Sequence, residues 1–294
     1  LVDRSNYRIV HCHSPIGGVI VRIACISARK NGTKMLYTVH GFHFFKGSSI
    51  LNWLFFYPIE KLCSRFTDIL LTMNQEDYQL ARKWNTCKVE YIPGIGIHTK
   101  NLRNISVNKK AYRKEFGLEE EDFVFMSTGQ VSLRKNHEVI IRALAEIDNP
   151  NVKYLIVGFG ELIEHHKALA KKLEVEHRVI FTGYRNDVKY ILHAVDGFVF
   201  PSLQEGLPVA LMEAMSVGLP VVCSRIRGNI DLIINGKGGY IYDCNDVKGF
   251  AEGMKKIVYG KDNVMGRRNI ETMKRFDIDT VNINMRNIYH GLLN

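Results

Sequence analysis

Two glutamates eight positions apart, Glu205 and Glu213, have the type and spacing most suggestive of ligand chemistry in this sequence. They lie in "PSLQEGLPVALMEAM", residues 201–215. Proline is favoured in the first turn of a helix, so we expect a helix from Pro208 to about Val217. A carboxylate on such an apolar helix needs partners, and the two hydroxyls of a ribose diol match its two oxygens. A salt bridge or a capping bond to the backbone remains the alternative for Glu213.

The start of this helix is a candidate anion site. Free backbone N–H groups at Gly206 and Leu207, together with the helix dipole, suit a phosphate. Glycine at this position allows a ligand to approach the backbone closely. Glu205 stands next to this site, although a glutamate here is also compatible with an ordinary loop or cap residue.

A second candidate is the cation pair Arg134 and Lys135, which follows "FMSTGQVSL" at the predicted entry of a helix over Asn136 to Ile147. Two adjacent cations can neutralise a pyrophosphate. The alternative is a solvated pair of surface charges.

Other strand ends carry weaker signals. "IVGFGE" (156–161) contains Gly158 and Gly160 but lacks the third glycine of a dinucleotide fingerprint. "TGYRND" (182–187) supplies Tyr184 and Arg185, which could face a flat base or lie on the surface.

Histidines also occur at two strand ends. His40 follows "TV" and precedes a glycine, and His11 and His13 share one face of an earlier strand. A lone histidine is often structural, but its position at a strand end favours a functional role for His40. No third metal ligand is spaced to join His11 and His13.

These side chains must be positioned by a repeated alternation of strands and helices. Short, continuous apolar runs are typical of parallel strands covered on both faces. They lie at 7–13, 34–41, 68–73 and 88–94, and then at 122–129, 153–160, 177–183, 196–202, 219–224 and 238–242. The polar segment 98–112 separates the two sets, which predicts two doubly wound α/β domains with ligands beyond the carboxyl ends of the strands.

Composition is that of a globular protein: 294 residues, 46% apolar and 24% charged. No apolar stretch approaches the roughly 20 residues needed to span a bilayer. Six cysteines without CxxC pairing predict neither a zinc site nor a disulfide framework, and favour a reducing cytosol. Residues 1–107 hold 14 Lys and Arg against 6 Asp and Glu, within a net charge of +10. This basic half suggests anionic partners, or a merely solvated surface.

Together these segments resemble the retaining nucleotide-sugar glycosyltransferases of family 4 (glycosyl transferases group 1), of the GT-B fold and of the bacterial capsular and exopolysaccharide type. The most specific match is Glu205 to Glu213 within "PSLQEGLPVALMEAMSVGLPVVCS". "STGQVSLRKN", "LIVGFGEL", "VIFTGYRNDV" and "IRGNIDLI" with "GGYIY" surround it. The similarity covers about 88–260 and, less specifically, 7–87, through "HCHSP" and "TVHG".

The resemblance implies a role for each matching residue. Lys135 would bind the donor diphosphate, Glu213 the ribose hydroxyls, and Glu205 would lie near the donor sugar. His40 and Glu205 would be the catalytic residues, with no metal ligand. The remaining donor-binding positions would be Gly129, Gly158, Tyr184, Arg185, Gly206 and Leu207.

The resemblance also implies a GT-B architecture: two Rossmann-like doubly wound parallel-sheet domains facing a cleft. We expect an acceptor-side domain over 1–107, a nucleotide-sugar-binding domain over 108–275, and a C-terminal helix over 276–294 that packs toward the first domain. Val281, Met285, Ile288 and Leu292 form its apolar stripe. The family's first strand should precede residue 1, which implies an N-terminally truncated chain. Gln130 stands where the family usually has an arginine, and Arg134 is the nearest candidate to compensate.

The expected activity is transfer of a hexosyl group from a nucleoside diphosphate sugar, with UDP as the favoured nucleotide. The expected acceptor is a saccharide or a polyprenyl-diphosphate-linked saccharide, in synthesis of a cell-surface polysaccharide. We expect no cofactor and no nucleic acid partner. A cytoplasmic location is expected, with an anionic membrane surface as a further candidate partner because of the bulky run 50–61. Alternatives are another GT-B enzyme such as a nucleotide-sugar epimerase, or a non-catalytic sugar-nucleotide binding module.

Overall fold

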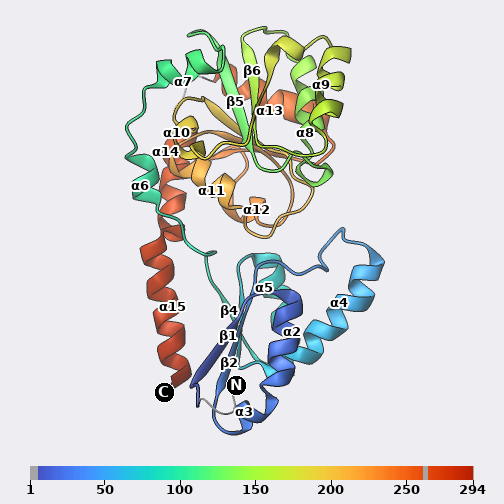
Figure 1. The fold of residues 1–294 in the computed structure, drawn as a ribbon, viewed down its shortest axis with the longest axis vertical. Coiled ribbons are helices and arrows are strands. Elements are labelled where there is room, and N and C mark those ends of the chain that lie inside the picture. The colour runs from blue at the N-terminus through green and yellow to red at the C-terminus, as the bar shows by residue number, and fades with distance from the viewer. Residues whose placement is uncertain (1–5, 261–263, 294) are drawn as a thin grey trace. The chain divides into compact units, whose positions relative to one another are not determined.

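The structure is a computed structural model that describes residues 6–260 and 264–293. It contains two compact units, one formed by the chain up to Gly96 together with the segment from Ile278, and the other by Ile97–Asp277. The boundary after Gly96 is earlier than residue 107, because the short helix α6 (Thr99–Arg103) packs on the second unit through Leu102. Figure 1 shows the elements of each unit.

The first unit is built on a four-stranded parallel sheet of order β1-β2-β3-β4. Each connection between strands passes through helices. Its elements are β1 (Ile9–Cys12), α2 (Pro15–Ala24), α3 (Ile26–Lys30), β2 (Lys34–Val39), α4 (Ile50–Cys63), η1 (Ser64–Phe66), β3 (Ile69–Thr72), α5 (Gln75–Arg82), β4 (Lys88–Tyr91) and the terminal helix α15 (Ile278–Leu293).

Sequence signals explain several boundaries in this unit. Asn74 accepts a hydrogen bond from the backbone N–H of Asp77 at 2.8 Å, which caps α5. Ser49 caps α4 in the same way through the N–H of Asn52. The helix α2 begins at Pro15, because proline fits the first helical turn.

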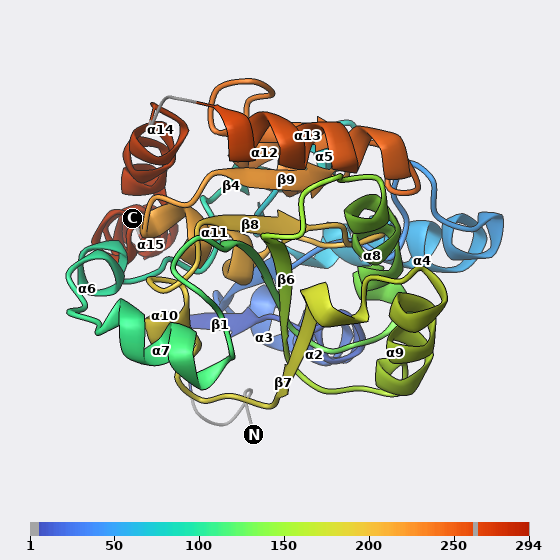
Figure 2. The ribbon, with the colours of Figure 1, turned by 90° about the horizontal axis from the view of Figure 1, so that it is seen from above.

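The second unit is built on a six-stranded parallel sheet of order β10-β9-β8-β5-β6-β7 (Figure 2). Its strands are β5 (Phe123–Thr128), β6 (Val152–Val157), β7 (Val179–Gly183), β8 (Gly197–Phe200), β9 (Val221–Ser224) and β10 (Gly239–Tyr242). Its other elements are α7 (Lys109–Glu115), η2 (Leu133–Lys135), α8 (His137–Ala145), α9 (Ile163–Lys172), η3 (Glu176–Arg178), α10 (Val188–Ile191), α11 (Val209–Ser216), α12 (Asn229–Leu232), α13 (Val247–Tyr259), α14 (Val264–Met273) and η4 (Lys274–Phe276).

Both faces of this sheet are buried, which is why its strands are apolar without alternation. Val124 and Met126 of β5 belong to one hydrophobic core, whereas Phe125 between them belongs to the other. The same alternation holds in β8, where Phe198 and Phe200 are separated by Val199. The expected doubly wound α/β architecture, with two all-parallel sheets, is confirmed.

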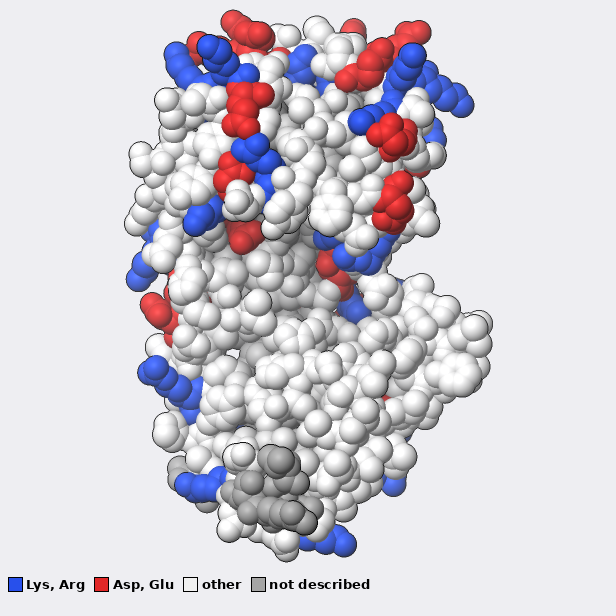
Figure 3. Space-filling model, viewed as in Figure 1, with Lys and Arg blue, Asp and Glu red and all other residues white. Residues whose placement is uncertain are grey.

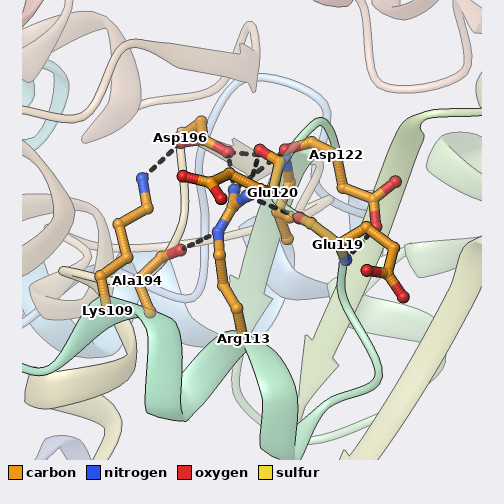
Figure 4. Close-up of polar contacts among 8 residues, drawn as sticks. Lys109, Arg113, Glu119, Glu120, Asp122, Ala194 and Asp196 are labelled. Carbon is orange, nitrogen blue, oxygen red and sulfur yellow. Dashed lines mark hydrogen bonds and ion pairs between the residues drawn. The ribbon is translucent and has the colours of Figure 1, made fainter.

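A buried arginine, Arg113, fixes α7 to the segments that lead into the central strands β5 and β8 (Figure 4). The guanidinium of Arg113 lies 2.5 Å from the carboxylate of Asp196 and donates to the carbonyl oxygens of Ala194, Glu119, Glu120 and Asp122. Lys109 reaches the other oxygen of Asp196 at 2.8 Å. Every donor direction of the fork is therefore used, so the buried charge is well compensated.

Candidate active site

The order of the strands indicates where the second unit could bind a ligand. Strands β5 and β8 are neighbours, and the chain proceeds outward from them in opposite directions, through β6 and β7 or through β9 and β10. This is a topological switch point, where open α/β sheets form a crevice beyond the carboxyl ends of the strands. The loops that leave β5 and β8 carry Lys135 and Glu205.

These two residues meet. Lys135 Nζ donates to Glu205 Oε1 at 2.8 Å, and the same oxygen accepts from Arg134 Nη1 at 2.7 Å. Lys135 and Glu205 retain only 12% and 14% side-chain exposure, whereas Arg134 retains 46%. The Nζ of Lys135 also lies 4.7 Å from the centroid of the Phe200 ring. Two cations share one carboxylate here, so this cluster keeps a net positive charge that can attract an anion.

Backbone contacts hold the two loops together. The N–H of Leu203 donates to the carbonyl of Arg134 at 2.8 Å. Asn136, with a φ of 52°, adopts the left-handed conformation and donates to the carbonyls of Pro201 and Cys244. The turn at Asn136 ends η2 and starts α8. Sequence reasoning missed this role, although an asparagine before a helix is a recognised signal for such a turn.

The helix predicted after Glu205 is α11, which begins at Val209 with Pro208 as its cap. No acceptor among the described residues is found for the backbone N–H groups of Gly206 and Leu207. A neighbouring loop supports this turn: Arg227 Nε donates to the carbonyl of Glu205 at 3.1 Å. These N–H groups therefore remain available to an anion at the start of α11.

Glu213 lies on α11 and is half-buried. Burial raises the pKa of its carboxyl above the usual value. Among residues 6–260 and 264–293, no side chain or backbone group pairs with this carboxylate. The salt bridge or backbone capping bond considered as an alternative is thus absent from the described part of the chain. A half-buried carboxylate without a protein partner is suited to accept hydrogen bonds from the hydroxyl groups of a ligand.

Glycines at the ends of β5 and β6 let these loops pack backbone to backbone. A Cβ atom at Gly158, where φ is 153°, would lie 1.8 Å from the carbonyl oxygen of Gly129. A Cβ atom at Gly129 would lie 3.1 Å from Cε of Lys135. Both glycines therefore shape the loop that positions Lys135, and any side chain at Gly158 would displace it.

Tyr184 and Arg185 have different surroundings. Tyr184 is 74% exposed, and its ring centroid lies 6.1 Å from that of Phe159, which is 60% exposed. The guanidinium of Arg185 instead binds Asp187 at 2.7 and 2.8 Å and Glu115 at 2.6 Å. These carboxylates raise the pKa of Arg185. Tyr184 and Phe159 thus expose aromatic surface to solvent, whereas the guanidinium of Arg185 already donates hydrogen bonds to Asp187 and Glu115. Sequence reasoning did not select Phe159.

His40 belongs to the first unit, at the end of β2, where it lies beside His13 with 3.4 Å between their ring nitrogens. Burial, and then the charge of His13, lower the pKa of His40. His11 bonds Thr38 and Tyr289 of α15, each at 2.7 Å. Burial and the neighbouring histidines lower the pKa of His11 to about 4. The sequence placed His11 and His13 on one face but gave no sign of Tyr289, because α15 is distant along the chain.

No cluster of three or more His, Cys, Asp or Glu side chains in the described residues has the arrangement of a metal site. None of the described helices is long and apolar enough to cross a membrane.

Two units, each built on an all-parallel sheet, match the GT-B fold of solved structures. HepE of Anabaena in complex with UDP superimposes with a TM-score of 0.87 at 21% identity, covering 99% of this chain and 80% of that one. HepE with UDP-glucose gives a TM-score of 0.84, also at 21% identity, with coverage of 99% and 80%.

The sequence profile of the family glycosyl transferases group 1 matches residues 108–272, and that of glycosyl transferase 4-like matches residues 1–74. The chain belongs to the glycosyl transferases group 1 family.

Two relatives are similar over most of their length. The putative glycosyltransferase EpsD of Bacillus subtilis is 33% identical over 300 residues, which is 100% of this chain and 79% of EpsD. An Escherichia coli UDP-Gal:alpha-D-GlcNAc-diphosphoundecaprenol alpha-1,3-galactosyltransferase is 32% identical over 278 residues, covering 91% of this chain and 70% of that enzyme.

Proposed function

We propose that this glycosyltransferase moves a hexosyl group from a UDP-sugar to a saccharide or a polyprenyl-diphosphate-linked saccharide, with retention at the anomeric carbon, in synthesis of a cell-surface polysaccharide. The observation that carries the donor assignment is the meeting of Lys135, Arg134 and Glu205 at the switch point of the second unit. The E. coli relative acts on a UDP-sugar and a diphosphoundecaprenol-linked acceptor, and HepE binds UDP and UDP-glucose. These supply the donor and acceptor classes of the proposal.

The charge of the donor site suits a diphosphate leaving group. As the bond between the sugar and the diphosphate breaks, negative charge grows on the diphosphate oxygens. Lys135 and Arg134, and the free N–H groups of Gly206 and Leu207, would stabilise that charge. Arg134 would supply the second cation at this site, since Gln130 is uncharged. Glu205 would hold both cations in position through Oε1, and its other oxygen would accept a hydrogen bond from a hydroxyl of the sugar.

The ribose and the base of the nucleotide would be bound by Glu213 and by the aromatic rings of Tyr184 and Phe159. The Glu213 carboxylate would accept hydrogen bonds from the two ribose hydroxyls, which would compensate its desolvation. The exposed rings of Tyr184 and Phe159 would stack on the base. Arg185 would act indirectly, through its bonds to Glu115 and Asp187 that fix the loop after β7. Gly129 and Gly158 would shape the loop under Lys135.

His40 is proposed as a second residue that orients the transferred sugar. Because its pKa is lowered, its imidazole is neutral at physiological pH and can either donate or accept a hydrogen bond. The neighbouring ring of His13 influences which nitrogen of His40 carries the proton.

The proposed acceptor also implies where the enzyme acts in the cell. A polyprenyl-linked saccharide presents its sugar at the inner face of the cell membrane, so we propose a cytoplasmic enzyme that associates with that face. The basic balance of residues 1–107 supports an anionic membrane as partner.

Product analysis tests the proposal. The chain is incubated with UDP-glucose, UDP-galactose or UDP-N-acetylglucosamine and a polyprenyl-diphosphate-linked saccharide, and the products are identified by mass spectrometry. We expect UDP and an acceptor that has gained one hexosyl unit. An epimerised donor without transfer would identify an epimerase, and nucleotide binding without turnover would identify a binding module; either result would overturn the proposal.

A further inference from the structure

The helices α2 and α4 of the first unit expose an unusual number of large apolar side chains. Nine of them are between 44% and 78% exposed. They are Ile16, Ile20 and Ile23 of α2, and Ile50, Leu51, Leu54, Phe55, Ile59 and Leu62 of α4. We call these nine residues the α2–α4 surface. Isolated exposed apolar residues are ordinary, but a contiguous group of this size marks an interaction site.

The two helices present one continuous face. The helix α2 lies in the connection from β1 to β2 and α4 in that from β2 to β3, and the three strands are successive neighbours in the sheet. Right-handed connections between such strands lie on the same side of the sheet. The helices also pack against each other, with Arg22 of α2 bound to Glu60 of α4 at 2.8 Å.

The exposed side chains are not needed by the core. In α4 the opposite face, with Trp53, Phe56 and Tyr57, packs on the hydrophobic core of the unit. A helix that is apolar on every side is normally buried on every side. Here nothing in the described part of the chain covers the outer face of α4, which is therefore both apolar and exposed.

The charges around this surface indicate what that partner is. Residues 15–66 contain seven Lys and Arg but a single acid, Glu60, which is buried against Arg22. Three exposed cations lie on or directly beside these helices in the chain: Lys30 at the end of α3, Lys61 near the end of α4, and Arg65 in η1. Figure 3 shows few charged atoms on the face of the first unit that carries α2 and α4. The surface is thus apolar, and these neighbouring charges are positive.

We propose that the α2–α4 surface docks onto an anionic lipid bilayer, with its aliphatic and aromatic side chains inserted at the acyl boundary and the neighbouring lysines and arginines among the head groups.

A protein partner fits this surface less well than a bilayer does. Protein interfaces carry about one hydrogen bond per 100–200 Å². The outer face of α2, with Ile16, Ile20, Ile23 and Ala24, offers no side-chain hydrogen-bonding group. A second copy of the chain would bring two sets of these cations together, which disfavours self-association through this face.

This inference rests on the membrane partner in the proposed function, but not on the transfer reaction, so binding to vesicles tests it without an activity assay. The chain is sedimented with vesicles of phosphatidylcholine alone, or of phosphatidylcholine with phosphatidylglycerol. We expect binding to the anionic vesicles. The double variant Leu54→Ser/Phe55→Ser should bind at least about tenfold more weakly, because two large apolar side chains no longer leave water. Ile283→Ser is the matched control, since Ile283 is 56% exposed on α15 and lies outside the surface.

Two further variants separate the charge from the apolar contribution. Lys61→Gln and Arg65→Gln should each weaken binding to the anionic vesicles by about fivefold, and should have no such effect on neutral vesicles. The variant Leu54→Trp should be quenched by lipids with brominated acyl chains more strongly than the parent chain, which already contains Trp53 and Trp84, whereas Ile283→Trp should be quenched no more strongly than the parent chain. UDP binding by all these variants should equal that of the parent chain, which keeps a failure of this proposal distinct from a failure of the donor site.

Several outcomes would overturn the inference. The double variant could bind vesicles as tightly as the parent chain, or brominated lipid could quench Leu54→Trp no more strongly than the parent chain. Light scattering could instead reveal a dimer that Leu54→Ser/Phe55→Ser dissociates, which would assign the surface to a second copy of the chain. Because the substituted side chains point away from the core, unchanged thermal unfolding of each variant verifies that its fold is intact.

Discussion

Nζ of Lys135 and Oε1 of Glu205 lie 2.8 Å apart although 70 residues separate them in the chain. They meet because β5 and β8 are neighbours at the point where the strand order of the second sheet reverses. The pair places a cation and a carboxylate at the switch point, the position at which open α/β sheets generally bind ligands. Arg134 binds the same carboxylate oxygen, so the positive charge at the site exceeds the negative charge.

Lys135→Ala should weaken UDP binding by about tenfold or more, because a charge-assisted hydrogen bond to the diphosphate contributes about 1.5–3 kcal/mol. Calorimetric titration with UDP measures the change. Lys167→Ala is the control, since Lys167 is an exposed lysine of α9 paired with Glu164 on the same helix. An unaltered affinity in Lys135→Ala would remove the lysine from the diphosphate site.

Glu213→Gln should make the ligand-free chain more stable while it weakens nucleotide binding. Burial raises the pKa of Glu213, so the folded state holds its proton to a higher pH than the unfolded state. Stability from this group is therefore present at low pH and is lost as pH rises through the raised pKa. At pH 7 the ionised carboxylate of Glu213 destabilises the folded state, whereas an uncharged glutamine does not. The variant Glu213→Gln should therefore unfold at a higher temperature than the parent chain.

The ribose contact of Glu213 can be isolated with a second ligand. The parent chain should bind UDP more tightly than 2′-deoxy-UDP, and Glu213→Gln should reduce that preference because one partner of the hydroxyl is altered. If the preference for UDP is the same in both proteins, Glu213 does not contact the 2′-hydroxyl.

Tyr184→Ala should weaken binding of UDP and GDP alike, by about tenfold, because stacking on an aromatic ring does not depend on the identity of the base. Tyr259→Ala provides a control, since Tyr259 is 60% exposed on α13. A loss confined to one of the two nucleotides would point to a hydrogen bond to the base instead of stacking.

His11 should make the first unit sensitive to acid. The pKa of His11 is lowered to about 4, whereas an unfolded histidine titrates near 6.5. Between these values the unfolded state binds the additional proton, so the free energy of unfolding should fall as pH decreases from about 6.5 to 4. Urea unfolding at pH 7 and pH 5 should show a larger loss for the parent chain than for His11→Gln. Equal losses in the two proteins would contradict this account.

Arg113→Met should destabilise the second unit by about 3 kcal/mol, because it leaves Asp196 and several backbone carbonyls without their buried donor. Chemical unfolding measures the effect, with Lys110→Met as a control, since Lys110 is an exposed neighbour on α7 whose ion pair with Glu120 spans 3.5 Å. A change of similar size in both variants would mean that the buried network of Arg113 contributes little.

The strands were predictable because parallel strands buried on both faces leave a simple apolar pattern. The runs around Phe125, Leu155 and Phe198 all became central strands for this reason. Local signals also placed the N-terminus of α11 near Pro208, within one residue of its observed start.

Contacts between distant segments were not predictable in the same way. The sharing of Glu205 by Arg134 and Lys135 depends on which strands become neighbours, and the binding of Arg185 to Glu115 depends on where α7 packs. The run 50–61 was ambiguous for a physical reason, since one face of α4 contributes to the core and the other is exposed. Periodicity cannot separate two apolar faces of one helix.

Calorimetric titration of the chain with UDP, repeated with Lys135→Ala, tests the central claim most directly. The account predicts that the parent chain binds UDP and that the variant binds it at least about tenfold more weakly. No uptake of UDP by the parent chain, or equal affinity in both proteins, would contradict it.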